Sequence, residues 1–345
     1  MSGAERLRVL IVRTSSLGDV VQAVPVLTAL RRALPAARLG WVVEEGYAPL
    51  LAGHPALDDL LPVALRRWGR APLRPAHLAE LGGFLDRLTG FGADVALDLM
   101  GSHKGAAIAA LSLAGRRIGL AARCRREPES ALWINEAVAN EAPHAVDRYL
   151  SLLAPLGIPS GPASFAPEAL FARARPPLPA AVAAGGPYLF LHPGAAWGNK
   201  RLPAATWADA LAQIARASGL RAWIGAAPGE ETLAREIAAR APGSAAIAAP
   251  DLPSLGTLLR EARLVLGGDT GPLHLAHALG SPVLAVMGPT DPGRHGPYRA
   301  PERVVAHRLP CSFCHRRMAE PRPCLTAIPA GEIAARALAL LAGNA

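Results

Sequence analysis

The sequence predicts an α/β protein with two domains, each built on a parallel β-sheet. Short apolar runs without alternation, typical of strands buried on both faces, recur between amphipathic helical stretches from end to end. The pattern restarts near the middle of the chain, and 345 residues exceed what one hydrophobic core usually supports. With 51% hydrophobic residues, the chain has enough apolar material for two cores.

The predicted strands alternate with helices in both halves of the chain. In the first half, they cover Arg8–Val12, Leu39–Val43 and Asp94–Leu97. In the second half, they cover Tyr188–His192, Arg221–Gly225, Leu264–Gly267 and Val283–Met287, with helices that include Trp207–Ser218 and Glu230–Ala239.

A stretch rich in Pro, Ala and Gly separates the two halves and favours a linker. We therefore expect one domain at residues 1–165, a linker at 166–186 and a second domain at 187–328. The remaining segment, residues 329–345, contains an apolar helix at Ala330–Leu341 that is too short to form a domain. We expect it to pack across the interface between the domains.

The bulk properties restrict localisation and partners. No apolar run reaches about 18 residues, so the sequence predicts no transmembrane helix. The first apolar stretch is short and is flanked by Arg8 and Arg13, unlike a signal peptide, and we expect a cytoplasmic protein. The net charge of +9 suits nucleic acid or anionic lipid. No recognisable nucleic-acid-binding module accompanies it, so we expect no nucleic acid partner.

Arginines gather in two groups of the first half. The first group has no acid nearby and contains Arg66, Arg67, Arg70 and Arg74. The second group contains Arg116, Arg117, Arg123, Arg125 and Arg126. Any single arginine is best explained as solvated surface. Two clusters favour a polyanionic ligand, because guanidinium groups bind phosphates and carboxylates in a bidentate manner.

The loop after the first predicted strand leads to Asp19, at the first turn of a helix and at the carboxyl edge of the sheet, where such sheets bind ligands. An aspartate that caps this helix would stabilise it by about 1 kcal/mol, which is the ordinary explanation. A cap needs neither Gly18, which lets another molecule approach the backbone, nor the hydroxyls of Ser15 and Ser16. Asp19 is therefore the leading candidate for a catalytic base.

A similar loop in the second half predicts an anion site. The strand at Leu264–Gly267 runs through Asp269 into a helix that opens at Pro272, so the amides of Thr270 and Gly271 point at whatever lies beyond the helix. Asp269 beside an anion suggests hydrogen bonds from sugar hydroxyls. His274 falls near the same helix end, where a packed helix histidine is the ordinary alternative.

Two further loops deliver charges to the same edge of this sheet. The loop after His192 carries Lys200, whose ammonium suits a diphosphate, and the loop after Gly225 carries Glu230, which suits hydroxyl or amine groups. Each has an ordinary explanation as a cap or a surface charge. No G-x-G-x-x-G follows the first strand of either half and no G-x-x-x-x-G-K-[ST] occurs, which disfavours NAD-type and P-loop sites.

Several segments together resemble the ADP-heptose:lipopolysaccharide heptosyltransferases of glycosyltransferase family nine, and among them the heptosyltransferase I type. They are Val9-Leu-Ile-Val-Arg-Thr-Ser-Ser-Leu-Gly-Asp-Val20, Val42-Val-Glu-Glu-Gly-Tyr47, Ala64-Leu-Arg-Arg-Trp68, Gly268-Asp-Thr-Gly271 and Gly288-Pro-Thr-Asp-Pro-Gly293. The resemblance covers nearly the whole chain. It implies a GT-B arrangement, in which two Rossmann-like domains with parallel sheets face each other across a cleft.

The resemblance also implies an activity, a donor and an acceptor. An inverting transferase would move heptose from ADP-heptose to a Kdo sugar of the lipopolysaccharide inner core, without a cofactor for catalysis. Its partner would be Kdo-lipid A, and it would bind peripherally to the cytoplasmic face of the inner membrane. Alternatives are heptosyltransferase II, another family-nine transferase with a different acceptor, and a GT-B-like epimerase.

The resemblance assigns roles to the singled-out positions. Asp19 matches the general base and Lys200 the lysine on the donor phosphates, so these two are the expected catalytic residues. The implied donor-binding residues are Lys200, Glu230, Asp269, Thr270, Gly271 and His274. The implied acceptor-binding residues are Arg66, Arg67, Lys104 and Arg126, and we add Ser15, Ser16 and Gly18 from the loop before Asp19.

Two segments depart from the heptosyltransferase I pattern. The sequence His192-Pro-Gly-Ala-Ala-Trp197 lacks the paired threonines of that type, which leaves the exact donor or acceptor open. The sequence also contains Cys311, Cys314 and Cys324, with His315 beside the second cysteine. Three thiols and an imidazole could hold a structural metal in tetrahedral geometry. The alternative is three reduced cysteines on a loop, since only one C-x-x-C is present.

Overall fold

The computed structural model describes residues 6–246 and 249–343, and the chain divides into two compact units. Unit 1 is Met1–Ala174 and unit 2 is Arg175–Ala345, so the division falls inside the segment 166–186 expected to be a linker. Residues 1–5 and 344–345, the ends of the first predicted domain and of the C-terminal segment, lie outside the described residues. None of the helices in the described ranges has the length and apolar character needed to cross a bilayer.

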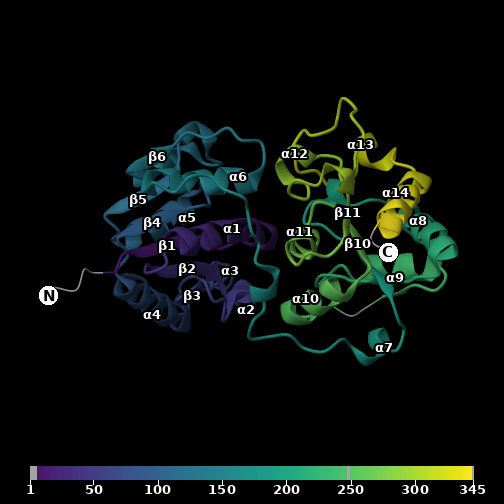
Figure 1. The fold of residues 1–345 in the computed structure, drawn as a ribbon, viewed down its shortest axis with the longest axis horizontal. Coiled ribbons are helices and arrows are strands. Elements are labelled where there is room, and N and C mark those ends of the chain that lie inside the picture. Colours follow the sequence, from purple (N-terminus) through teal and green to yellow (C-terminus); the bar gives the residue numbers. More distant parts are fainter. Residues whose placement is uncertain (1–5, 247–248, 344–345) are drawn as a thin grey trace. The chain divides into compact units, whose positions relative to one another are not determined.

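Unit 1 contains a six-stranded sheet in the order β3-β2-β1-β4-β5-β6, and all neighbouring strands are parallel (Figure 1). Its strands are β1 (Arg8–Val12), β2 (Arg38–Glu44), β3 (Asp59–Val63), β4 (Val95–Asp98), β5 (Arg116–Leu120) and β6 (Glu136–Val138). The strand order reverses between β1 and β4. At such a switch point the loops at the carboxyl ends diverge and leave room for a ligand.

The helices of unit 1 connect these strands. The α-helices are α1 (Leu17–Ala33), α2 (Ala48–Leu51), α3 (Leu65–Trp68), α4 (Pro75–Phe91), α5 (His103–Leu111) and α6 (Ala145–Leu150). Short 3₁₀ helices cover Glu45–Tyr47, Ala122–Cys124, Pro128–Trp133, Ser151–Leu156 and Pro167–Ala169. Four of the five residues of β1 are buried, because helices cover both faces of a parallel sheet.

Unit 2 repeats the same topology. Its sheet has the order β12-β11-β10-β7-β8-β9, again with parallel neighbours, so the switch point lies between β7 and β10. The strands are β7 (Tyr188–His192), β8 (Arg221–Ile224), β9 (Ala245–Ala246), β10 (Leu264–Gly267), β11 (Val283–Val286) and β12 (Val304–Val305). The predicted α/β class, with a Rossmann-like parallel sheet in each half, is confirmed.

The helices of unit 2 lie between and after these strands. The α-helices are α7 (Ala180–Ala183), α8 (Ala204–Ser218), α9 (Glu231–Arg240), α10 (Leu252–Glu261), α11 (Gly271–Ala278), α12 (Pro292–His295), α13 (Pro323–Thr326) and α14 (Ala330–Gly343). Short 3₁₀ helices cover Gly198–Lys200 and Pro301–Arg303.

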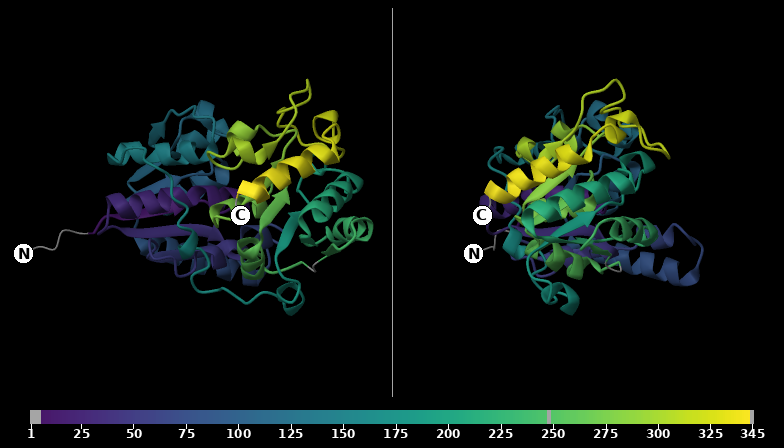
Figure 2. Two further views of the ribbon diagram at one scale, coloured as in Figure 1. Left: turned by 45° about the vertical axis from the view of Figure 1, so that its right-hand side comes forward. Right: turned by 90° about the vertical axis from the view of Figure 1, so that its right-hand side faces the viewer.

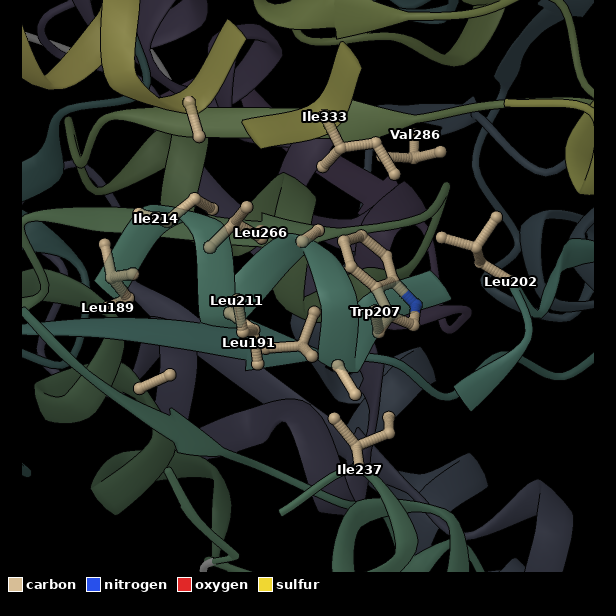
Figure 3. Close-up of a cluster of buried hydrophobic side chains, with 14 of the residues drawn as sticks. Leu189, Leu191, Leu202, Trp207, Leu211, Ile214, Ile237, Leu266, Val286 and Ile333 are labelled. Carbon is tan, nitrogen blue, oxygen red and sulfur yellow. The ribbon is translucent and has the colours of Figure 1, made fainter. Parts of the chain in front are cut away.

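The core of unit 2 explains where its last helix lies. Trp207, Leu211 and Ile214 of α8 fall four and three residues apart, so they share the helix face that packs on the sheet (Figure 3). Ile333 of α14 reaches the same cluster. Figure 2 shows α14, in yellow, lying along α8. The helix α14 also contacts β10, β11 and β12. The segment expected to pack between domains therefore contributes to the core of unit 2.

The central strands match the sequence predictions, whereas the outer ones were missed. The bounds of β1, β7 and β10 are those expected. The strands β8 and β11 end one residue earlier than expected, and β2 and β4 differ by one residue at both ends. We did not predict β3, β5, β6, β9 or β12. Pro62 interrupts the apolar pattern of β3. The strand can contain a proline because it lies at the edge of the sheet, where one backbone N–H has no neighbouring strand to pair with. The strand β5 begins with Arg116 and Arg117, which we interpreted only as part of a basic cluster.

Candidate active site

Unit 1 places Asp19 in a dense set of hydrogen bonds beside the end of β1. Ser16 is the N-cap of α1, and the Oδ2 atom of Asp19 accepts hydrogen bonds from the Ser16 amide at 3.0 Å and the Ser16 hydroxyl at 2.8 Å. Asp19 is therefore not the N-cap itself but the third helical residue, which closes a capping box. Its side chain is still 32% exposed, so the capping role leaves it accessible to a reactant.

Two residues that the sequence analysis did not single out hold the other oxygen. Arg13 Nη2 lies 2.5 Å from Asp19 Oδ1, and the Tyr149 hydroxyl donates to the same oxygen at 3.3 Å. Arg13 is buried, donates to the Leu99 carbonyl at 2.5 Å and stacks over the Tyr149 ring at 5.1 Å. A charge directly after a buried strand was a usable signal for Arg13. Tyr149 is 130 positions away from Asp19 and gave none.

Arg13 stays protonated although it is buried. Burial on its own lowers the pKa of this guanidinium, but the nearby Asp19, Tyr149 and Asp98 outweigh it and raise the pKa above its ordinary value. A permanent positive charge thus lies against one oxygen of the candidate base.

The expected acceptor-binding residues follow the carboxyl ends of the strands of unit 1. Arg66 comes after β3, Lys104 after β4 and Arg126 after β5, and all three are exposed. Arg66 lies over the Tyr47 ring at 5.2 Å. In the loop before α1, Ser15 is half-buried, Ser16 is exposed and Gly18 is buried, so Gly18 leaves less open backbone than expected.

Several other arginines of the two clusters have acidic partners inside unit 1, so these positions also have a structural explanation that does not require a ligand. Arg67 bridges Glu45 and Glu80, at 3.0 Å and 2.7 Å, although neither acid is near it in the sequence. Arg116 pairs with Glu136 across β5 and β6 at 2.6 Å. Arg125 forms an ion pair with Asp98, and both side chains are fully buried. Buried guanidinium groups need such partners.

In unit 2, two loops on either side of the switch point meet at Asp269. Lys200, from the loop after β7, places its Nζ atom 2.5 Å from Asp269 Oδ2, and His274 of α11 places Nε2 2.9 Å from Oδ1. Burial opposes ionisation of this carboxyl, but His274 and Lys200 more than compensate, and the pKa of Asp269 lies far below its usual range. Both oxygens that we assigned to sugar hydroxyls are thus engaged by side chains in this structure.

The N-terminus of α11 has the features of the predicted anion site. Thr270 is its N-cap, Gly271 its first residue and Pro272 lies in the first turn. The Thr270 hydroxyl oxygen is buried, and within residues 6–246 and 249–343 it has no hydrogen-bond partner. Lys200 lies 4.4 Å from the centre of the Trp197 ring, and its ammonium has three donors, of which Asp269 uses one.

Glu230 lies against the loop after β7, which also carries Lys200. The Glu230 Oε2 atom accepts from the Ala227 amide at 3.2 Å and lies 3.7 Å from His192 Nε2. A side chain at position 194 would overlap this carboxylate, since a Cβ there would lie 1.8 Å from Oε2, so Gly194 is needed for the close approach. Burial lowers the pKa of His192 to about 4, so this histidine is neutral at pH 7.

The cysteine-containing loop is docked on the Lys200 loop. Asn199 is fully buried and exchanges hydrogen bonds with the backbone of Arg316 and Met318, at distances of 2.8–3.2 Å. The Cys324 amide donates to Cys311 Sγ at 3.3 Å. No group of three or more His, Cys, Asp or Glu side chains in the described part of the chain could hold a metal ion, so the structure does not support the metal considered at Cys311, Cys314 and Cys324.

Comparisons with known proteins identify the family of this chain. The family model that matches residues 84–323 is described as glycosyltransferase family 9 (heptosyltransferase). Lipopolysaccharide heptosyltransferase 1 of Pseudomonas aeruginosa is 34% identical over 333 residues, which cover 92% of this chain and 88% of that protein.

Two solved structures are similar over almost their whole length. The Escherichia coli heptosyltransferase WaaC with ADP matches with a TM-score of 0.79 and 30% identity, over 98% of this chain and 100% of that one. The E. coli ADP-heptose lps heptosyltransferase II matches with a TM-score of 0.75 and 19% identity, over 98% and 99% of the two chains, a likeness of fold alone. With the family model covering more than half of it, this chain belongs to glycosyltransferase family 9, the heptosyltransferases.

Proposed function

We propose that this heptosyltransferase moves heptose from ADP-heptose to a Kdo sugar of the lipopolysaccharide inner core, with inversion at the anomeric carbon. The observation that carries the proposal is the anion site of unit 2. Lys200 and the N-terminus of α11 converge beside Thr270, whose buried hydroxyl lacks a partner in the described residues. A diphosphate supplies the negative charge and the acceptor oxygens that such a site binds.

The leaving group is ADP, and its departure is the step that unit 2 assists. As the bond between the anomeric carbon and the phosphate oxygen breaks, the electron pair stays on that oxygen. The ammonium of Lys200, the amides at the start of α11 and the Thr270 hydroxyl stabilise the added charge, since fixed donors aimed at developing charge lower the barrier. Asp269 and His274 hold this arrangement, since Asp269 contacts both the Lys200 ammonium and the His274 imidazole.

The nucleophile is a Kdo hydroxyl, and Asp19 of unit 1 is proposed to accept its proton while the new carbon–oxygen bond forms. A carboxylate at the first turn of α1, beside Arg13, stays ionised at neutral pH. Such a base is weak but always in the reactive form. Arg66, Lys104 and Arg126 are proposed to bind the carboxylates and phosphates of Kdo-lipid A.

The proposed acceptor also implies a location. Kdo-lipid A is anchored in a bilayer, so we propose that the protein works peripherally at the cytoplasmic face of the inner membrane. The net charge of +9 and the exposed arginines of unit 1 favour an anionic lipid surface.

A turnover assay with two acceptors tests the proposal. Purified protein is given ADP-heptose with Kdo-lipid A, and in parallel with the already heptosylated acceptor. We expect ADP release and heptosylated product with Kdo-lipid A only. Turnover only on the heptosylated acceptor would assign the chain to the heptosyltransferase II reaction. The 34% identity to heptosyltransferase 1 supports the first outcome. Free sugar nucleotide products without any acceptor would indicate an epimerase.

A further inference from the structure

The two oxygens of Asp19 have different partners. Oδ1 contacts Arg13 at 2.5 Å and Tyr149 at 3.3 Å. Oδ2 accepts the amide and the hydroxyl of Ser16. A carboxylate has about four lone-pair directions, so these four donors account for the usual capacity of the group. An acceptor hydroxyl can approach only by displacing one of them.

The four donors are not equally easy to displace. The Ser16 amide is fixed by the start of α1, and Arg13 is buried between the Leu99 carbonyl and the Tyr149 ring. Tyr149 is 8% exposed, so its hydroxyl is also held within the protein. Ser16 is exposed and its hydroxyl needs only a rotation about one bond to leave.

We propose that Arg13 and Tyr149 are positioning residues that hold Oδ1 of Asp19, and that Oδ2, where the Ser16 hydroxyl now lies, is the oxygen that takes the proton of the acceptor hydroxyl. This inference rests on the proposed function of Asp19 as the base. In the reaction, the acceptor O–H bond breaks, its proton moves to Oδ2, and the acceptor oxygen bonds to the anomeric carbon as ADP leaves. Arg13 and Tyr149 keep the carboxyl group oriented throughout and keep it ionised until the proton of the acceptor arrives.

Arg13 and Tyr149 reach Oδ1 of Asp19 from outside its own helix. Arg13 comes from the end of β1, Tyr149 comes from α6, and Asp98 at the end of β4 acts on Arg13. The helix α6 packs on α1 and also carries Asp147 and Arg148. Arg148 donates to the Cys124 carbonyl at 2.9 Å. Removing a donor from Oδ1 leaves the negative charge less compensated, so the pKa of the carboxyl must rise.

The experiment compares pH profiles of kcat/KM for the wild-type protein and for Tyr149→Phe and Arg13→Lys, with ADP-heptose and Kdo-lipid A. For Tyr149→Phe we expect the acid limb to move up by about one pH unit, the equivalent of one lost hydrogen bond to a charged group. For Arg13→Lys, which keeps the charge but loses the fixed geometry of the guanidinium, we expect kcat to fall about 10- to 100-fold. The KM for ADP-heptose should stay unchanged in both.

The matched control is Tyr188→Phe, which removes another buried tyrosine hydroxyl, one that donates to the Leu258 carbonyl of unit 2 at 2.8 Å. Its pH profile should follow the wild type. Circular dichroism and melting curves identify any variant that fails to fold. If Arg13→Lys does not fold, the pH profile of Tyr149→Phe, which is the milder change, tests the positioning role. A wild-type acid limb in folded Tyr149→Phe, together with wild-type kcat in folded Arg13→Lys, overturns the positioning role.

Asp19→Asn separates this inference from the proposed function. If Asp19→Asn turns over as fast as the wild type, Asp19 is not the base and both proposals fail. If Asp19→Asn is inactive while Tyr149→Phe and Arg13→Lys behave as the wild type, only the positioning role fails.

Discussion

Asp19 and Asp269 both lie beside the switch point of a sheet, in two units of the same topology, yet their surroundings differ. Each follows a central strand that borders the switch point of its sheet, β1 or β10. Asp19 is 32% exposed and faces one guanidinium, a phenol and the start of its own helix. Asp269 is only 9% exposed and is held between an ammonium and an imidazole. The comparison teaches that loops on either side of a switch point suit different purposes, and it fits the proposed roles of Asp19 as a reachable proton acceptor and of Asp269 as a buried anchor.

The largest expected effect is on the rate constant of Asp19→Asn. Loss of a positioned general base typically lowers kcat by about 10²- to 10⁴-fold, and the affinity for ADP should not change because the proposed donor site is in unit 2. Steady-state kinetics and calorimetric ADP titration measure the two quantities. Asp86→Asn, at an exposed position of α4, is the matched control and should keep full activity. Full activity in Asp19→Asn would remove the contrast between the two aspartates.

Asp269→Ala should act on stability and on ADP binding together. The change leaves the Lys200 ammonium, 15% exposed, without its carboxylate, and removing one partner of a buried ion pair typically costs about 3–5 kcal/mol. Asp19→Asn should cost less, because Asp19 is 32% rather than 9% exposed and the amide oxygen of Asn can still accept a hydrogen bond from Arg13. Urea unfolding measures both, with Asp209→Ala on the surface of α8 as control. Equal losses for the two aspartates would show that Asp269 is not an anchor.

Acidification should affect the buried groups of unit 2 in two steps. Burial lowers the pKa of His192 to about 4 from an ordinary 6.5, so the unfolded chain binds a proton that the folded chain refuses. Stability therefore falls as the pH drops from about 6.5 to 4, by at most about 1.4 kcal/mol per pH unit for one such group. The pKa of Asp269 is lowered, so its contribution is present above its unfolded pKa of about 3.9 and is lost only at lower pH.

His192→Gln separates these steps. Burial also lowers the pKa of His54 and His295 to about 4. The variant should therefore reduce, but not abolish, the dependence of the free energy of unfolding on pH between 6.5 and 4, whereas Asp269→Asn should change it only below about pH 4. His103→Gln, an exposed position at the start of α5, serves as control. The assignment fails if the slope between pH 6.5 and 4 is the same with and without the His192 imidazole.

The smallest effects on the free energy of unfolding are expected at the N-caps of α1 and α11. Ser16 donates to Asp19, so Ser16→Ala should lower the free energy of unfolding by about 1 kcal/mol and leave ADP affinity unchanged. The Thr270 hydroxyl has no partner in the described part of the chain, so Thr270→Val should cost less stability. It should weaken ADP binding about 10- to 100-fold, as expected for a lost hydrogen bond to a charged group. Unchanged ADP affinity in Thr270→Val would exclude the hydroxyl from the donor site.

Much of the fold could be predicted because the strands nearest the switch points are buried on both faces. Such strands are uninterrupted apolar runs, and β1, β7 and β10 could be read with their true bounds. Outer strands such as β6 are shorter and half exposed, and their sequence does not differ from that of a loop. The candidate site was predicted in the same manner, since a polar loop directly after a buried strand marks the ligand edge of the sheet.

The partners of each site residue could not be predicted. Sequence alone singled out Lys200 and Asp269 as donor-site residues but not their ion pair, and it singled out Asp19 without Arg13 or Tyr149. It also assigned Arg67, Arg116 and Arg125 to a polyanion, whereas folding brings acids to each of them.

The sequence by itself determined the two α/β units and the loops that carry chemistry, because hydrophobic periodicity and polar loop residues are local properties. Only the tertiary structure decided which charges meet. Lys200 and Asp269 are 69 positions apart, and Tyr149 and Asp19 are 130 positions apart. No local pattern records such pairs, since their distances depend on how the sheet orders its strands and how the helices pack on it. That packing leaves Asp19 accessible and buries Asp269.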